Sequence, residues 1–264
     1  MKPFSRALLL LALILAAINL RPGITSLAPL IERIAEELAL SRSLISLTTA
    51  LPVLCMGLLA PFAPRLAVRL GLERTIALCM AVIAVALLLR AVGHASAILI
   101  GSAVLLGAAI AVAGPLLSGF IKRHFAGHMG SVVGWYSLSM AIGGAGGAVL
   151  TVPATQWLDN DWTYGLAIWA LPAVVGLVLW LCLPNRAEAE SEEGGLGLPW
   201  RQPRAWLISA FFAIQAGLFY ALATWAVARY HEAGLSLMHS NSLFSVSMLM
   251  GLPSAFLLPW LAQR

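Results

Sequence analysis

Long apolar blocks separated by short polar loops make up most of this sequence. Eight blocks are near or above the roughly 20 residues that a helix needs to cross the hydrocarbon core of a bilayer. Backbone polar groups inside lipid must find partners within the protein, and a helix satisfies them within one segment. The pattern therefore predicts an all-α polytopic membrane protein, with spanning helices over residues 7–31, 43–64, 75–93, 96–121, 131–155, 163–183, 205–228 and 241–262.

The composition supports a membrane protein and argues against several other classes. Hydrophobic residues make up 61% and charged residues 10% of the 264 positions, whereas a soluble domain carries about 25% charged residues. The basic residues are scattered between apolar blocks, so the net charge of +5 does not indicate nucleic-acid binding. The cysteines form no CxxC pair and no cluster with histidine, which predicts no disulfide framework, no metal site and no cofactor: Cys55, Cys79 and Cys182.

Lysine and arginine are distributed unequally between the two sides of the predicted topology. Lys2 and Arg6 resemble the start of a signal peptide, but the apolar run resumes after Arg21, so we interpret the first block as an uncleaved span. A basic excess in short loops marks the cytoplasmic side, which favours an inner (plasma) membrane location with the N-terminus inside. Eleven basic residues then lie inside (Lys2, Arg6, Arg65, Arg69, Arg74, Lys122, Arg123, Arg186, Arg201, Arg204 and Arg264) and four outside (Arg33, Arg42, Arg90 and Arg229).

The longest loop divides the chain into six helices plus two. It is charged, rich in glycine and bounded by prolines, so we expect a six-helix half over residues 1–183, a cytoplasmic linker over 184–204 and two helices of a second half over 205–264. Pro64–Arg69 and Pro259–Arg264 share the pattern P-x-L-A-x-R at a spacing of 195 residues. Parallel six-helix repeats of that period would give roughly 390 residues and twelve helices. We therefore expect this sequence to be a fragment that lacks the last four helices.

Arg21 is the only charged side chain that the pattern places deep in a span. All eleven acidic residues and all five histidines fall in predicted loops or at helix ends. An arginine at the centre of a spanning helix costs about 2.5–3.5 kcal/mol on insertion scales and usually faces a bundle interior or a water-filled cavity. Three explanations stay open: Arg21 binds an anionic or dipolar solute, pairs with an acid in helices beyond this sequence, or reaches the interface from a tilted helix.

Pro22 and Gly23 predict a kink beside this arginine. Proline has no N–H to donate to the carbonyl of the residue four positions earlier, and it clashes with the preceding turn. Irregular backbone at membrane depth is tolerated where it lines a cavity, although membrane helices often contain proline for other reasons. Thr25 lies one turn on from Arg21 on the same face, and Asn19 is close in sequence, so both are candidate solute-binding residues.

The seventh block adds further polar candidates. Gln215 is the only amide or charged side chain in the body of that helix, and it can both donate to and accept from a polar solute. A helix–helix hydrogen bond is an equally good explanation. Tyr220 and Trp225 are candidates for the same site, or else packing and interface aromatics. Ser118, Tyr136 and Ser139 are further candidates to face water, although hydroxyls in such helices are more often bonded to a carbonyl of their own helix. The run GGAGG, residues 143–147, predicts close helix packing.

Several stretches carry a resemblance to a known family. They are NLRPGITSLAPLI, LTTALPVLCMGLLAPFAPRLAVRLGLERT, SGFIKRHF with GWYSLSMAIGGAGG, and FYALATWAVARYHEAGLS. The chain resembles the major facilitator superfamily, and more closely its cyanate and 2-nitroimidazole transporter (CynX/NimT-like) branch. The resemblance implies a bundle of two six-helix halves, and a small anion such as cyanate as the kind of solute that Arg21 would meet.

The resemblance also implies a conformational role for the loop after the second helix. The superfamily keeps the pattern G-x-x-x-D-R-x-G-x-R-R there, and the matching residues are Arg65, Arg69, Gly71, Glu73 and Arg74. The match is partial, because Val68 replaces the aspartate and Pro64 the first glycine. Ala103 replaces the arginine that many proton-coupled members carry in the fourth helix, and the fifth helix has no Gly-Pro step. These departures argue against simple proton-antiport drug efflux.

We interpret the chain as a transporter of a small anionic or polar solute. Helices one, four and seven would line a central cavity, and two halves would rock about it. We expect a monomer in the lipid bilayer whose partner is the solute. Efflux of drugs or toxic compounds is the nearest alternative. A membrane enzyme is disfavoured because the spans hold no nucleophile–base pair and no metal-ligand cluster, and a non-transporting receptor on the same scaffold stays open.

Overall fold

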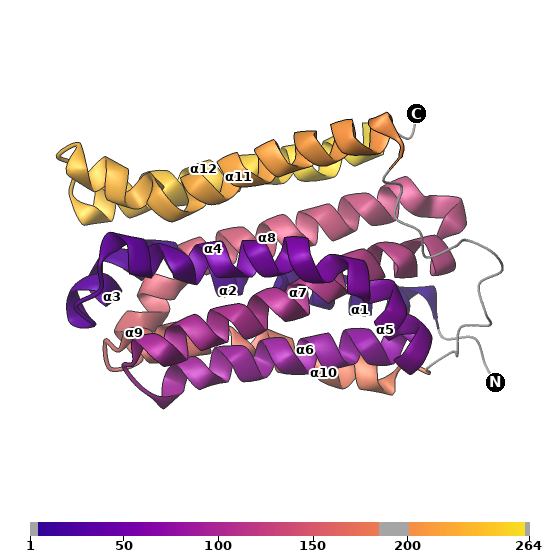
Figure 1. Ribbon diagram of the computed structural model, residues 1–264, viewed down its shortest axis with the longest axis horizontal. Helices are drawn as coiled ribbons and strands as arrows, with labels where there is room; N and C mark the ends of the chain where they lie inside the picture. Colours follow the sequence, from indigo (N-terminus) through magenta and orange to yellow (C-terminus); the bar gives the residue numbers. More distant parts are fainter. Residues whose placement is uncertain (1–4, 185–200, 262–264) are drawn as a thin grey trace.

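Eight membrane-length helical segments form one bundle in the computed structural model, which describes residues 5–184 and 201–261 (Figure 1). Seven of them are apolar and long enough to cross a membrane, and α12 is a 25-residue helix that follows them. Every regular element of the described residues is helical. The predicted all-α, eight-helix architecture is thereby confirmed.

The helices that make up the spans differ from the predicted blocks mainly at their ends and interruptions. The first span comprises α1 (Arg6–Asn19), α2 (Pro22–Thr25), a 3-10 turn (Ala28–Leu30) and α3 (Ile31–Glu37), and the second comprises α4 (Arg42–Leu59), a 3-10 turn (Ala60–Phe62) and α5 (Ala63–Leu70). The third span is α6 (Leu72–Leu89) with a 3-10 turn (Arg90–Val92), and the fourth is α7 (Ser96–His124), followed by a 3-10 turn (Ala126–His128). The fifth span is α8 (Met129–Trp157), the sixth comprises α9 (Trp162–Ala167) and α10 (Ala170–Cys182), and the seventh and eighth are α11 (Pro203–Glu232) and α12 (Leu237–Leu261).

Polar side chains start several of these helices. The first backbone N–H groups of a helix have no partner within it, so a preceding hydroxyl or carboxylate stabilises the start. The Ser5 hydroxyl accepts from the N–H of Leu8 at 3.3 Å, the Ser41 hydroxyl from that of Leu44 at 3.2 Å, and Asp161 accepts from the N–H of Thr163 at 2.8 Å. These caps explain why α1, α4 and α9 begin where they do.

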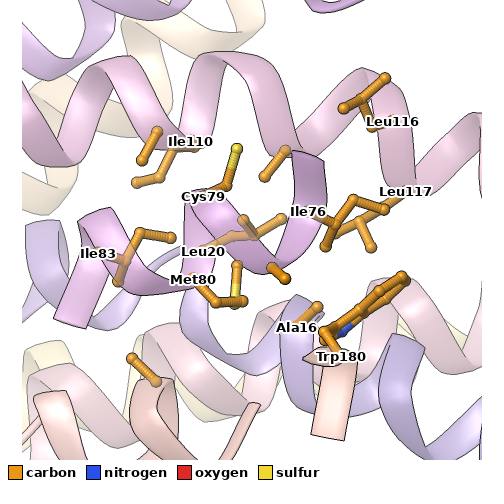
Figure 2. Close-up of a cluster of buried hydrophobic side chains, with 14 of the residues drawn as sticks. Ala16, Leu20, Ile76, Cys79, Met80, Ile83, Ile110, Leu116, Leu117 and Trp180 are labelled. Carbon is orange, nitrogen blue, oxygen red and sulfur yellow. The ribbon is translucent and has the colours of Figure 1, made fainter. Parts of the chain in front are cut away.

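The core of the first six spans is built around α6. Ile76, Met80 and Ile83 are fully buried against α1, α7 and α10 (Figure 2). Lipid tails are as apolar as these side chains, so close van der Waals packing and hydrogen bonds hold such helices together rather than expulsion from water. One such hydrogen bond runs from Trp180 Nε1 of α10 to the carbonyl oxygen of Ala12 in α1, at 3.0 Å.

Glycines of α8 let this helix pack directly on the interrupted first span. A Cβ added at Gly143 would collide with the carbonyl oxygen of Ile18, the group to which Pro22 has no N–H to donate. A Cβ at Gly147 would collide with Thr25 Oγ1 and come within 3.0 Å of Pro22 Cα. The GGAGG run therefore provides the close packing that the sequence predicted.

Helix α11 meets the first six spans mainly near its turn to α12, whereas α12 packs extensively against α8. The buried residues of α11 are Ala223, Thr224, Val227 and Ala228, all in its second half. Ala223 and Val227 pack with Phe244 of α12 and with Ala28 and Ala148. At the start of α4, Arg42 forms an ion pair with Glu232 at the end of α11, with 2.8 Å between nitrogen and oxygen. This end of the bundle is therefore closed between the two groups of helices.

We predict that Gly143→Ala destabilises the protein. Overpacking a tight contact costs about 1–3 kcal/mol, and here the obstructing atom is backbone, which cannot rotate away. Thermal unfolding of the detergent-purified protein should show a clearly lowered midpoint.

Gly101→Ala in α7 is the matched control, because a Cβ there meets nothing within 4 Å. This variant should be neutral or gain about 0.5–1 kcal/mol from the loss of a helical glycine. Equal midpoints for the two variants would show that the α8 contact is not close in solution.

Candidate functional site

A central cavity lies between the first six spans and the last two helices. It consists of two adjoining spaces of about 450 Å³ and 700 Å³, which share Arg21, Met140, Gln215 and Phe219 in their walls. The walls also include the polar residues Ser118, Tyr136, Ser137, Tyr220 and Ser247. The predicted helices one, four and seven contribute, and helices two, five and eight contribute as well. The cavity is therefore bounded by both groups of helices.

Arg21 reaches this cavity from the break in the first span. Helix α1 ends at Asn19 and α2 begins at Pro22, so the helix is interrupted where the proline predicts a bend. The Arg21 carbonyl accepts from the N–H groups of Ile24 at 3.0 Å and Thr25 at 3.1 Å, which starts the short helix that follows. The backbone of Arg21 is therefore tied to α2 while its side chain enters the cavity.

The guanidinium of Arg21 contacts an aromatic ring and no carboxylate among the residues that the structure describes. Its Cζ lies 4.4 Å from the centroid of the Phe219 ring of α11, which is a cation–π contact. Its Nε is buried without a hydrogen-bond partner. Its stem lies on α8, where a Cβ added at Gly144 would be 3.4 Å from Arg21 Cδ. The cation is thus held in place with hydrogen-bonding capacity to spare.

Two further side chains of the predicted site line the cavity with Arg21. Gln215 borders both spaces and Tyr220 borders the larger one. The Tyr220 hydroxyl donates to Met56 Sδ at 3.8 Å, a weak interaction that a better acceptor would replace. Phe219 lay between them in the sequence, but an apolar residue in an apolar helix gave no signal that it would face the arginine.

The other predicted solute-binding residues lie outside the cavity walls. Asn19 is buried, and its amide donates to the carbonyl oxygens of Leu15 at 2.7 Å and Pro172 at 3.0 Å, which joins α1 to α10. Thr25 is buried, and its hydroxyl donates to the Arg21 carbonyl at 3.2 Å. Trp225 is half-buried in α11. These placements assign structural contacts to Asn19 and Thr25.

Most other hydroxyls of the spans bond within their own helices. Ser118 donates to the Gly114 carbonyl at 3.3 Å, and Ser139 donates to the Trp135 carbonyl at 2.7 Å. This confirms the common explanation for such residues in membrane helices. In the part of the chain that the structure describes, no group of three or more histidine, cysteine or acidic side chains is arranged to hold a metal ion.

In the loop after the second span, the acidic residue is buried and the basic residues are exposed. Gly71, at a φ of 89°, separates α5 from α6 in a conformation that favours glycine. Arg65, Arg69 and Arg74 are exposed. Glu73 is 3% exposed and its Oε1 lies 3.6 Å from His124 Nε2 at the end of α7. The acidic member of this loop therefore points into the bundle while its basic members face outward.

Comparison with known proteins decides the family. The model of the Major Facilitator Superfamily matches residues 9–264. The chain is 35% identical to the cyanate transport protein CynX of Escherichia coli over 262 residues, 97% of this chain and 67% of that protein. This chain belongs to the major facilitator superfamily. It is also 32% identical to the uncharacterized transporter YycB of Bacillus subtilis and 28% identical to the 2-nitroimidazole transporter of Escherichia coli, each over 97% of this chain. These relatives confirm the CynX/NimT-like branch.

Solved structures support the same fold for this superfamily member. A D-xylose–proton symporter superposes with a TM-score of 0.71 at 14% identity, covering 94% of this chain and 66% of the symporter. The chain spans about two thirds of the length of the curated relatives that it matches, 64% for YycB and 65% for the 2-nitroimidazole transporter. The protein is therefore a multi-pass membrane protein from a superfamily of transporters of small solutes.

One charged residue of this superfamily member was misplaced by the sequence analysis. Arg90 was assigned to an outer loop and Arg21 was expected to be the only charged side chain deep in a span. Arg90 instead is 1% exposed and its guanidinium lies inside the bundle. A long side chain at the end of a span can turn inward as well as snorkel outward, and hydropathy does not distinguish these directions.

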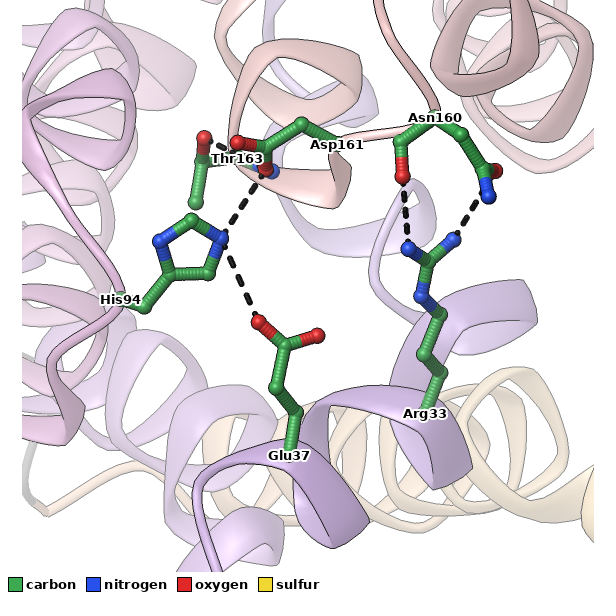
Figure 3. Close-up of polar contacts among 6 residues, drawn as sticks. All are labelled: Arg33, Glu37, His94, Asn160, Asp161 and Thr163. Atoms are coloured by element: carbon green, nitrogen blue, oxygen red, sulfur yellow. Dashed lines mark hydrogen bonds and ion pairs between the residues drawn. The ribbon is translucent and has the colours of Figure 1, made fainter.

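A polar cluster joins the loops at the end of the bundle where α3 and α9 lie (Figure 3). His94 Nε2 lies 3.3 Å from Glu37 Oε1 and 3.2 Å from Asp161 Oδ1. Beside it, Arg33 donates to the side chain of Asn160 at 3.2 Å and to its carbonyl at 2.6 Å. These contacts connect the ends of the first, third and sixth spans around the half of the bundle that holds Arg21.

Asp161 gives this cluster a dependence on pH. Desolvation acts to raise the pKa of Asp161, but hydrogen bonds from the Thr163 N–H and hydroxyl, together with nearby His94, outweigh it and lower the pKa below its usual value. A carboxyl whose pKa is lower in the folded state stabilises the fold while it is ionised. That stabilisation is complete above the unfolded pKa and is lost as the pH falls through the folded pKa.

We therefore predict that the thermal midpoint of the purified protein falls as the pH is lowered from about 5 to about 3. Asp161→Asn should remove part of this dependence, because asparagine keeps the helix cap but does not titrate. The difference in midpoint between wild type and this variant should shrink at low pH. An equal difference at pH 7 and at pH 3 would contradict the assignment.

Proposed function

We propose that this protein is a secondary transporter that moves a small anionic or polar solute, of the cyanate or nitroimidazole kind, through the central cavity by alternating access, with Arg21 as the anchor. The observation that carries the proposal is a guanidinium in the cavity between the two groups of helices, with no carboxylate within ion-pair distance among the described residues. Such an arrangement leaves the charge available to a solute.

The energetics of Arg21 favour an anionic ligand. A cation at membrane depth costs about 2.5–3.5 kcal/mol on insertion scales, which only a counter-charge or water can offset in full. The Phe219 ring offsets part of it through its quadrupole. An anion that accepts charge-assisted hydrogen bonds from the planar guanidinium would offset the remainder.

The polar wall around Arg21 supports a small solute that also needs neutral hydrogen-bonding groups. Gln215 both donates and accepts, and the tyrosine hydroxyls of Tyr136 and Tyr220 border the same space. The volumes of the two spaces, about 450 Å³ and 700 Å³, exceed that of a triatomic anion several-fold. A water occupies about 30 Å³ of liquid, so a small anion would bind here with several waters.

The asymmetric closure of the bundle supports alternating access. One end is closed by the buried contacts of α11 and by the ion pair between Arg42 and Glu232. The larger space extends instead toward Ala60 at the end of α4 and Phe212 near the start of α11. With the N-terminus in the cytoplasm of an inner membrane, which the positive-inside bias favours, this arrangement is an inward-facing state that would convert to an outward-facing one by rocking.

Drug or toxic-compound efflux is a second candidate function. The apolar lining of the larger space favours it, through Leu20, Met56, Ile110, Phe212 and Phe219. A neutral aromatic compound would use these walls without needing Arg21. The two functions therefore differ in whether transport depends on the positive charge of residue 21. We propose no enzymatic activity for the site.

We predict that Arg21→Ala in the protein from the complete reading frame abolishes saturable uptake of radiolabelled cyanate into proteoliposomes. Arg21→Lys should retain less than about one tenth of the wild-type affinity if both donors of the guanidinium fork are used. Arg123→Ala, which removes an exposed arginine at the end of α7, is the matched control and should leave uptake unchanged. Undiminished uptake by Arg21→Ala would refute the anchor, and uptake of neutral aromatic compounds by that variant would favour efflux.

A second prediction concerns a variant that adds a carboxylate beside Arg21. Gln215→Glu places a carboxylate in the same cavity walls as Arg21, and the two should form an ion pair. We expect cyanate binding to fall by at least about tenfold, as the anion must then displace an internal partner. Gln215→Leu should weaken binding less, because it removes a hydrogen bond but no positive charge. Stronger anion binding by the glutamate variant would contradict this view of the site.

A further inference from the structure

Arg90 is a buried cation that does not line the central cavity. It lies at the end of the third span, borders neither part of the cavity, and is 1% exposed. No carboxylate pairs with it in the described parts of the chain. A charge in this position is costly, since burying an ion without a counter-ion is disfavoured. Its contacts must therefore provide something that a neutral side chain would not.

The Arg90 guanidinium spans two different helices. Its Nη1 donates to the carbonyl oxygen of Gly23 in α2 at 2.9 Å, and its Nε donates to the hydroxyl of Ser102 in α7 at 3.1 Å. The Ser102 hydroxyl in turn donates to the Leu99 carbonyl at 2.8 Å. The planar guanidinium has several donors in fixed directions, so it can bond to acceptors on two helices at once. A single hydroxyl or amide side chain would not reach both acceptors together.

The carbonyl that Arg90 contacts belongs to the interrupted segment of the first span. Beyond the short helix, the N–H of Leu27 donates to Ile24 at 3.3 Å and not to Gly23. The Gly23 carbonyl is thus a buried backbone acceptor with no partner in its own helix, and an unsatisfied group of this kind is costly where water is absent. Arg90 satisfies it from a neighbouring span, with a charged donor that forms a stronger hydrogen bond than a neutral one.

We propose that Arg90 is a positioning residue that fixes the segment from Leu20 to Leu27 and so aims Arg21 into the cavity. This segment carries Arg21 at its start. It also packs tightly on α7, because a Cβ added at Gly23 would be 2.5 Å from Leu106 Cδ2. The proposal rests on the proposed function only for the role of Arg21. The anchoring of the segment is a separate claim about the fold.

The test measures hydrogen–deuterium exchange of the full protein in lipid nanodiscs, without solute. Arg90→Met keeps the apolar stem and removes both hydrogen bonds, and we expect amide exchange across residues 20–27 to rise by about tenfold or more, as a charged hydrogen bond warrants. Arg90→Lys should give an intermediate rise, because a single ammonium reaches one of the two acceptors. Exchange in the other spans should be unchanged, whereas a general loss of structure would raise it throughout.

Two control variants complete the exchange experiment. Arg123→Ala removes an exposed arginine elsewhere in the bundle and should leave residues 20–27 unaffected. Ser102→Ala keeps the bond to Gly23 and should raise exchange there less than Arg90→Lys does. If Arg90→Met fails to fold, the lysine variant decides. Exchange within twofold of wild type in both Arg90 variants would overturn the proposal.

Equilibrium binding of radiolabelled cyanate then separates this proposal from the function itself. Arg90→Met should lower cyanate affinity by about tenfold and Arg90→Lys should partly restore it, as expected for a residue that acts through Arg21. Absence of cyanate binding by the wild type would refute cyanate as a solute, while the exchange data would still decide whether Arg90 holds the segment. Local exchange that rises without any loss of wild-type cyanate affinity would overturn the link to Arg21.

Discussion

The need to satisfy every backbone polar group inside a bilayer governs the arrangement around the first span. Interrupting a helix at membrane depth leaves carbonyl groups that water cannot reach. Two carbonyl groups of the interrupted segment find donors, since the Arg21 carbonyl accepts from Thr25 and the Gly23 carbonyl accepts from Arg90, and Gly143 lets α8 pack directly against the Ile18 carbonyl. The break that brings a guanidinium into the cavity is therefore supported by contacts from several other spans.

The same constraint explains which parts of the fold could be predicted from sequence. Spanning helices must be long and apolar, so hydropathy located all eight, and Pro22 marked the interruption because its missing N–H is a property of the residue itself. Arg21 could be selected because nothing near it in sequence neutralises it. These features depend on one segment at a time.

The features that could not be predicted depend on where side chains from different spans meet. Phe219 faces Arg21 only because α11 crosses the break in the first span. Asn19 turns to Pro172 rather than to the cavity, and Arg90 turns into the bundle rather than to water. Each of these residues has two plausible directions on a helix, and the choice depends on helix rotation and packing that periodicity in a uniformly apolar segment does not encode.

The placement of the polar groups also separates rigid parts of the bundle from parts that can move. Within the first six spans, the break is anchored by direct hydrogen bonds and by glycine contacts, both of which need sub-ångström fit. Across to α11, Arg21 meets Phe219 by cation–π contact and Arg42 meets Glu232 at an exposed ion pair, whereas α12 packs extensively against α8. Cation–π contacts tolerate sliding, and exposed ion pairs are weak and easily exchanged with water. An anchor held firmly on one side and loosely on the other would keep its orientation while α11 slides past it, as the alternating access that we propose requires.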